Sequence, residues 1–77
     1  MSYGYSARLI ALNKNADARM IGVRLGKLCM KRDIPVATVA SKLGVSRQTV
    51  YNWFCGTHSP KPAVALKLQA YLTSLSS

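Results

Sequence analysis

The sequence contains no glutamate, and Asp17 and Asp33 are its only acidic residues. Its single histidine, His58, is far from both acids along the chain. General acid–base catalysis needs a titratable side chain within hydrogen-bond reach of the reacting group, and nucleophilic catalysis needs a nucleophile beside a base. The sequence indicates neither combination, so we expect that the protein is not an enzyme.

Cysteine is scarce as well, because Cys29 and Cys55 are the only two and form no Cys-x-x-Cys motif. Two cysteines do not make a disulfide framework, and in a cytosolic protein they stay reduced. Cys29, Cys55 and His58 would supply three zinc ligands, but no fourth is evident and a structural zinc site uses four. We therefore expect no metal, no other cofactor and no small-molecule ligand.

Long apolar runs are missing, although hydrophobic residues make up 49% of the 77 residues. A transmembrane helix needs about 20 predominantly apolar residues in succession, so none is expected. The N-terminal stretch MSYGYSARLIALNK lacks the charged, apolar and small-residue regions of a secretory signal. These absences favour one small cytoplasmic domain.

Positive charge is what the sequence has in excess. Eleven Lys and Arg residues stand against the two acids and give a net charge of +9. So large a charge on a small domain favours a polyanionic partner, and nucleic acid is the first candidate. Binding to a membrane surface would require the cations on one face of a single long helix, whereas here they are spread along the chain. A soluble domain with an incidental basic surface is the remaining alternative.

Helical periodicity dominates and strand patterns are nearly absent, which predicts an all-α fold. We expect a first helix from Ala16, capped by Asn15 and with Asp17 in its first turn, where the helix dipole favours an anion. Pro35 should end this helix near Arg32 or Asp33 and begin the next one. The predicted helices are 16–32, 35–43, 47–55 and one from 62 onward, with residues 3–14 either a short helix or a flexible arm.

The helix predicted over 47–55 divides cleanly when its residues are placed at about 100° intervals. Thr49, Val50, Trp53 and Phe54 fall on one side, which we assign to the core. Arginine can grip guanine, and Gln and Asn can grip adenine, each with two parallel hydrogen bonds, while Tyr can donate to a phosphate. Residues of these types occupy the other side: Arg47, Gln48, Tyr51 and Asn52.

The stretch VATVASKLGVSRQTVYNWFCG resembles the helix-turn-helix of the Cro/cI-type (XRE-like) phage repressor family. Gly44 matches the turn glycine, Ser46 the N-cap, and Gly56 the glycine that ends the recognition helix. The resemblance covers roughly residues 19–72 and implies a compact, lambda-repressor-like domain of four to five helices. It implies a DNA-binding transcriptional regulator, acting as a homodimer on a double-stranded operator in a bacterial or phage-infected cell. It also implies a set of DNA-contact residues: Arg47, Gln48, Tyr51, Asn52, Thr38, Ser46, Lys61 and His58.

The chain departs from the family pattern in two places. Pro35 and Val36 stand where the family often has a capping Ser or Thr followed by Gln, which leaves Thr38 as the substitute phosphate contact. A fifth helix after the fourth is missing or shortened to TSLSS. We divide the chain into an N-terminal segment, 1–15, and the helix-turn-helix domain, 16–77. The segment 1–15 is a flexible arm, a dimer element, or a basic arm that lays Arg8 and Lys14 along DNA.

Two other functions are compatible with the motif. Similar modules occur in transposases and recombinases, where a catalytic domain or subunit accompanies them. Some small helix-turn-helix proteins act as antitoxins that cap a partner protein, for which a long segment after the fourth helix would be the expected feature.

Overall fold

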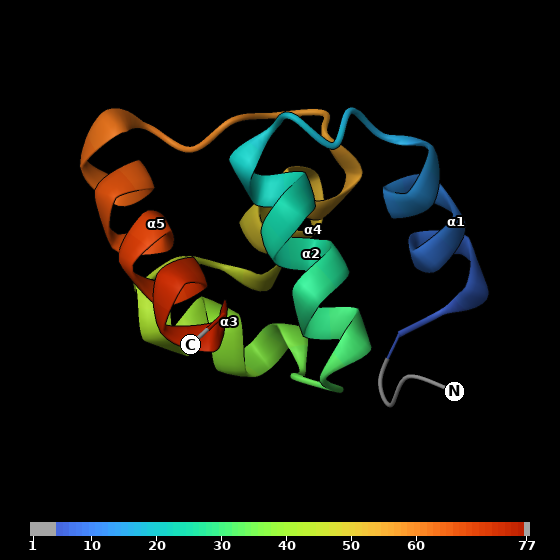
Figure 1. The fold of residues 1–77 in the computed structure, drawn as a ribbon, viewed down its shortest axis with the longest axis horizontal. Coiled ribbons are helices and arrows are strands. Elements are labelled where there is room, and N and C mark those ends of the chain that lie inside the picture. Colours follow the sequence, from blue (N-terminus) through green and yellow to red (C-terminus); the bar gives the residue numbers. More distant parts are fainter. Residues whose placement is uncertain (1–4, 77) are drawn as a thin grey trace.

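The computed structural model describes residues 5–76, in which five helices and no strands occur. The predicted all-α fold with four to five helices is therefore confirmed. Helices α2 and α4 cross at the centre, α1 and α5 lie on opposite sides of this pair, and α3 lies at one end (Figure 1). The helix bounds are α1 Ala7–Asn15, α2 Ile21–Lys31, α3 Val36–Leu43, α4 Arg47–Cys55 and α5 Pro62–Ser76.

Helix α4 has the bounds expected from its sequence, because local signals define both of its ends. The Ser46 hydroxyl accepts a hydrogen bond from the Thr49 amide at 3.2 Å, as an N-cap does. At the other end Gly56 has a φ of 76°, in the left-handed region that glycine enters without a steric penalty. Gly44 ends α3 in the same way, with a φ of 67°.

The predicted start of α2 is wrong. Asn15 is the last residue of α1 rather than an N-cap, and α2 begins at Ile21 after the non-helical Met20. The Asp17 carboxylate accepts hydrogen bonds from the backbone amide of Arg19 at 2.9 Å and from its guanidinium at 3.1 Å. Aspartate that bonds the backbone two residues ahead stabilises a turn in competition with a helix. Asp17 therefore forms the turn between α1 and α2.

The C-terminal residues extend an existing helix. Residues 73–76 continue α5 and do not form a separate short helix after it. The helix that brings the number to five in the described residues is α1, near the N-terminus. Leu68 and Leu72 of α5 are buried, and Val64 and Leu75 are half-buried against the core.

The described part of the N-terminal segment is folded onto the domain. Tyr5 and Leu9 are 93% buried, and the Tyr5 ring stacks on Phe54 with 6.3 Å between the ring centroids. The Tyr5 hydroxyl donates to the Ile34 carbonyl at 2.6 Å. Burial raises the pKa of this phenol, which keeps its proton available for the bond. Tyr3 and Gly4, also considered as part of a flexible arm, lie outside the described residues.

Asn13 is the buried polar side chain that joins three helices. Its Nδ2 donates to the Phe54 carbonyl of α4 at 2.8 Å and to the Val23 carbonyl of α2 at 3.1 Å. Phe54 is in the last turn of α4, where carbonyls have no partner within the helix. Asn13 thus supplies a partner that the helix itself cannot.

We expect Asn13→Ala to lower the free energy of unfolding by about 1–3 kcal/mol, because the Phe54 carbonyl would be left buried without a partner. Asn15→Ala is the matched control, since Asn15 is exposed in the same helix, and should change the free energy by less than about 0.5 kcal/mol. Urea unfolding of both variants measures the difference. Equal effects would show that Asn13 does not hold α1 in place.

Candidate nucleic-acid interface

Helix α4 presents a polar face to solvent, as its sequence predicts. Arg47 and Gln48 are exposed, and Tyr51 and Asn52 are half-buried. On the opposite side the apolar residues of the helix form part of the core: Val50, Trp53 and Phe54. We call Arg47, Gln48, Tyr51 and Asn52 the reading face.

A hydrogen bond along the reading face orders two of its side chains. The Gln48 amide donates from Nε2 to Asn52 Oδ1 at 3.1 Å, one helical turn away. Both amides are of the type that pairs with the edge of adenine. The bond links the two amides along one line of the helix surface.

Two glycines of α2 set the position of α4. A Cβ built on Gly22 would lie 2.6 Å from Trp53 Cβ, and one built on Gly26 would lie 2.8 Å from Phe54 Cγ. Real Cβ atoms do not approach other atoms this closely, so the helices pack at a distance that only glycine allows. Sequence reasoning missed this feature, although the spacing of four residues puts both glycines on one helix face.

The turn between α3 and α4 is tight. The Val45 amide donates to the Ala40 carbonyl at 3.0 Å, across the left-handed Gly44. Ala40, a small residue of α3, is buried, and Val45, in the turn, is half-buried. Both therefore pack between α3 and α4. Two helices joined by such a turn form the helix-turn-helix arrangement, in which the second helix enters the major groove of DNA.

The loop after α4 brings polar side chains beside the end of the reading face. The Asn52 carbonyl accepts hydrogen bonds from the Thr57 and His58 amides and from the Thr57 hydroxyl. This folds the loop back on α4 around a hollow of about 380 Å³. His58 and Lys61, both predicted as contacts, are exposed and line this hollow together with Asn52.

Thr38 has a different position. It is exposed in the first turn of α3, where Pro35 precedes the helix without a side-chain cap. It lines a separate, shallow hollow with Ala37, Ser41 and Lys42, and no residue of the reading face lines that hollow. Its predicted contact with a phosphate stays a prediction.

Helix α1 borders the reading face on its other side. A hollow of about 270 Å³ lies beside their contact and is lined by Arg8 and Leu12 of α1 and by Gln48 and Tyr51 of α4. Sequence reasoning considered Arg8 only as part of an arm. Its place in a docked helix depends on the distant contacts of Tyr5 and Asn13, for which the sequence carries no local signal.

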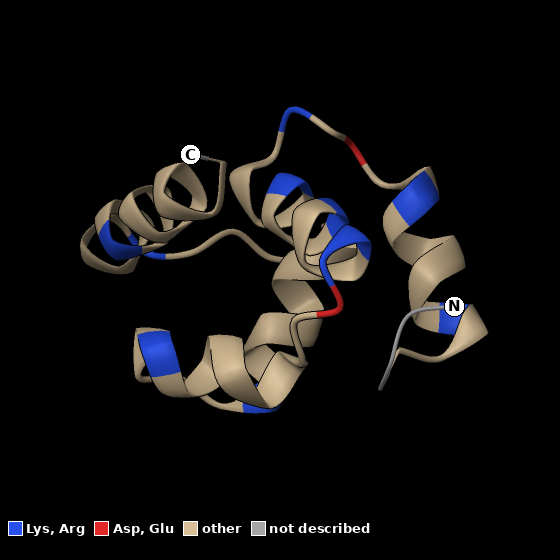
Figure 2. Ribbon diagram, turned by 60° about the horizontal axis from the view of Figure 1, so that its bottom comes forward, with Lys and Arg blue, Asp and Glu red and all other residues tan. Residues whose placement is uncertain are grey.

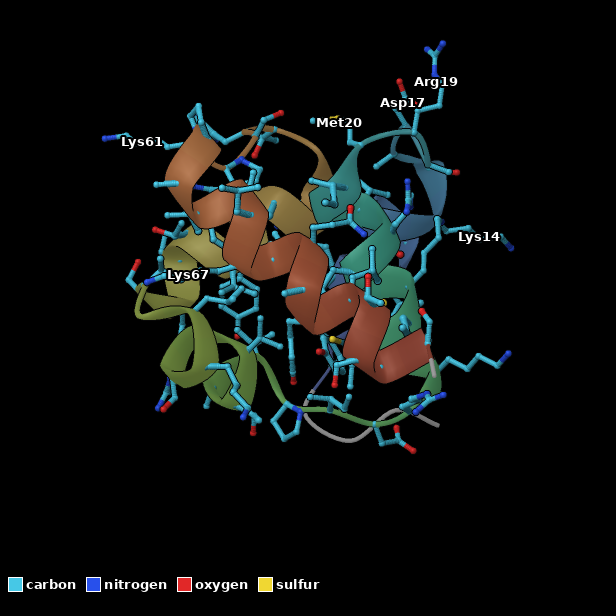
Figure 3. All side chains as sticks on the ribbon, turned by 60° about the vertical axis from the view of Figure 1, so that its left-hand side comes forward. Lys14, Asp17, Arg19, Met20, Lys61 and Lys67 are labelled. Atoms are coloured by element: carbon cyan, nitrogen blue, oxygen red, sulfur yellow. The ribbon has the colours of Figure 1, made fainter. Side chains whose placement is uncertain are left out.

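The two acidic residues are kept away from the reading face. None of the five described helices contains an acid, since Asp17 and Asp33 lie in the turns before and after α2, whereas every helix carries Lys or Arg (Figure 2). Asp17 pairs with Arg19, and both lie with Lys14 on the side of the molecule away from Lys61 (Figure 3). No carboxylate lines either hollow beside α4, so nothing there would repel a phosphate.

The described residues contain no cluster of three His, Cys, Asp or Glu side chains that could hold a metal ion. Burial raises the pKa of the Cys29 thiol to about 12, so this cysteine is a neutral core residue near pH 7. Within residues 5–76, no helix has the length and apolar character needed to cross a bilayer.

The sequence model of the helix-turn-helix family matches residues 25–74, from the middle of α2 to near the end of α5. The chain therefore belongs to the helix-turn-helix family, of the Cro/cI (XRE-like) type that its motif resembles. At the family level this is a DNA-binding domain of transcription regulators, which bind double-stranded DNA. No curated protein and no solved structure matches the chain.

We expect Gly22→Ala to lower the free energy of unfolding by about 1–3 kcal/mol, because its methyl group would overlap Trp53. Replacing Gly by Ala inside a helix ordinarily stabilises it by up to about 1 kcal/mol, so the sign of the effect is informative. Ser41→Ala, on the exposed side of α3, is the control and should have little effect. Increased stability of Gly22→Ala in urea unfolding would show that α2 and α4 leave space for a methyl group between them.

Proposed function

We propose that this protein is a Cro-like repressor that binds a specific double-stranded operator and so blocks access of RNA polymerase. The observation that carries the proposal is the reading face. It combines the exposed Arg47 with the hydrogen-bonded amides of Gln48 and Asn52. No carboxylate lines the two hollows beside it.

Base recognition in this proposal is the task of the N-terminal half of α4. Arg47, in the first position of the helix, is exposed and can reach guanine O6 and N7. Gln48 and Asn52 can exchange their mutual hydrogen bond for the N6 and N7 edge of adenine. Tyr51 is half-buried beside the core and would use its hydroxyl on a base or on the adjoining backbone.

Backbone contacts would position α4 in the groove. Lys61 and His58 lie past the C-terminal end of α4, where a DNA strand bordering the groove would pass. The Ser46 hydroxyl caps the Thr49 amide, so the first-turn amides that remain to meet a phosphate would be those of Arg47 and Gln48. The first turn of α4 contains no acid that would oppose this.

The operator would be a pseudo-palindrome bound by a homodimer, as the family resemblance implies. Two recognition helices related by a twofold axis would enter successive major grooves on one side of the duplex, about 34–36 Å apart.

Selection of bound duplexes from a random pool at moderate salt tests specificity and symmetry together. A palindromic consensus is expected. Absence of any enrichment would contradict the proposal and favour an antitoxin or other protein-binding role, whereas an asymmetric consensus would contradict the homodimer and suit a transposase or recombinase subunit.

We expect Arg47→Ala to weaken binding to the selected sequence by about 1–3 kcal/mol and to relax the preference at one base pair, because a guanine contact is lost. Binding titrations with the consensus and with single-base variants measure both effects. Arg24→Ala is the control, since Arg24 is exposed on α2 and does not border α4. Equal losses on specific and random DNA would exclude base recognition by Arg47.

Lys61→Ala should act on affinity without changing the preferred sequence, because a phosphate contact carries no base information. We expect the slope of log K against log salt to become shallower by about one unit. Lys14→Ala, which removes the same charge on the side of the molecule away from Lys61 (Figure 3), should leave the slope unchanged. If both variants change the slope alike, Lys61 acts through general charge and not through a contact.

A further inference from the structure

Helix α1 lies outside residues 25–74, which match the family, and yet it packs on the recognition helix. The contacts described above hold it by its buried side. Tyr5 stacks on Phe54, and Asn13 bonds the Phe54 carbonyl at the end of α4. Because both contacts are made to α4 itself, the exposed side of α1 has a defined position beside the reading face.

Arg8 is the cation that this docking places at the border of the reading face. It is exposed in the first turn of α1 and lines the hollow that Gln48 and Tyr51 line from α4. Its charge also reaches Cys55 in the last turn of α4: burial raises the pKa of that thiol, and Arg8 opposes the rise. Geometry and electrostatics therefore agree that Arg8 flanks α4.

We propose that Arg8 binds a backbone phosphate of the operator at the edge of the major groove, with the Tyr51 hydroxyl as a second donor to the same phosphate. Helix α1 thereby extends the DNA interface beyond the helix-turn-helix motif. The proposal rests on the DNA-binding function proposed above and assigns a role to a segment that the family match does not include.

The walls of the hollow suit an ion pair. Leu9 is buried and Leu12 is 45% exposed, so apolar groups stand on the α1 side of the hollow, around the base of Arg8. A guanidinium and a phosphate that meet against apolar surface lose water and attract each other more strongly than they would in open solvent. Arginine binds phosphate with two parallel hydrogen bonds, which also fixes the orientation of the backbone.

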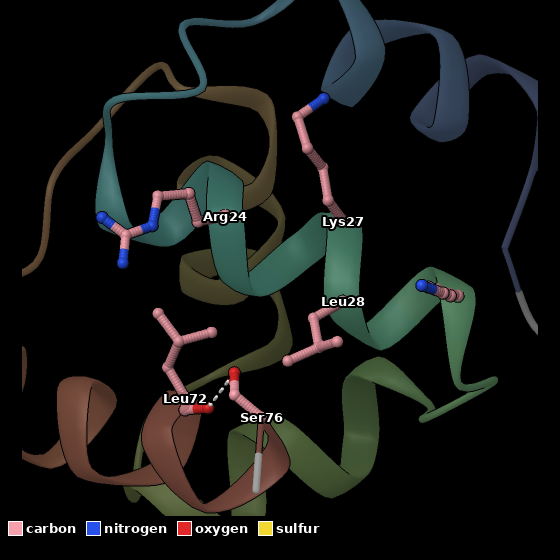
Figure 4. Close-up of a pocket in the computed structure, with 6 residues that line it drawn as sticks. Arg24, Lys27, Leu28, Leu72 and Ser76 are labelled. Atoms are coloured by element: carbon pink, nitrogen blue, oxygen red, sulfur yellow. Dashed lines mark hydrogen bonds between the residues drawn. The ribbon is translucent and has the colours of Figure 1, made fainter.

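The other basic cluster of the domain cannot serve the same duplex. Arg24, Lys27 and Lys31 line a hollow between α2 and α5, with Leu28 and Leu72 as its apolar part (Figure 4). Gly22 and Gly26 of α2 face α4, and at about 100° per residue Arg24 and Lys31 lie nearly opposite them on the helix. DNA at the reading face therefore meets Arg8 and is far from this cluster, which makes Arg24 a matched arginine control.

The test measures binding of the full chain to its selected duplex at several salt concentrations. Arg8→Ala should make the salt slope shallower by about 0.9, so that a rise from 50 to 200 mM salt weakens the unmodified protein about 3.5-fold more than the variant. Base preference should not change. Arg24→Ala and Lys14→Ala should keep the original slope, and thermal unfolding checks that each variant is folded.

Neutralising single phosphates of the duplex as methylphosphonates identifies the contact. One position should weaken binding of the unmodified protein and have a smaller effect on Arg8→Ala, in which the Tyr51 hydroxyl alone still contacts that phosphate. Tyr51→Phe should be sensitive to the same position and should be non-additive with Arg8→Ala, because the two side chains share one phosphate. Additive effects, or different positions for the two variants, would contradict the shared contact.

The outcomes separate this inference from the function on which it rests. If Arg47→Ala loses base preference while Arg8→Ala keeps the full salt slope, the inference is wrong and the proposed function holds. If Arg24→Ala changes the slope as much as Arg8→Ala, the effect is one of net charge and the inference is again wrong. If the unmodified protein selects no sequence, the proposed function itself fails.

Discussion

The close approach of α2 and α4 is the constraint on which the rest of the structure depends. At Gly26 the missing side chain makes room for the Phe54 ring and for the amide of Asn13, so three helices meet at one point. The helices pack at a distance that only glycine permits, and interiors this dense resist displacement. Trp53 and Phe54 are therefore held inward, which turns Arg47, Gln48 and Asn52 outward. The orientation of the reading face is thus a consequence of packing on its hidden side.

The charged residues of the helices are all basic. With no glutamate in the sequence and both aspartates in turns, every helix surface is neutral or basic. Such a surface attracts DNA in many orientations, since phosphate contacts are independent of sequence. The orientation of the protein on DNA must then be set by the few cations that border the reading face. In our proposals Lys61 supplies one border and Arg8 the other, and the groups between them read the bases.

The elements that sequence reasoning located correctly are those with local signals. Gly44 marks the end of α3, Ser46 and Gly56 mark the two ends of α4, and apolar periodicity divides the two faces of α4. The start of α2 was placed wrongly because Asn15 and Asp17 suit both a helix start and a turn. Only the bonds that Asp17 makes with Arg19 decide between these alternatives. The role of the glycines in α2 was missed because glycine alone does not say which neighbour approaches it.

By itself the sequence determined the class of fold, the motif, and the residue types offered to a partner. Each of these depends on spacing within one segment. The tertiary structure decided that residues 7–15 form a helix docked on α4, that Arg8 stands beside Tyr51, and that Arg24 faces away from both. These facts depend on contacts such as that of Asn13 with Phe54, 41 residues apart. No local pattern encodes such a contact, because a buried amide finds its partner only when separate helices pack together.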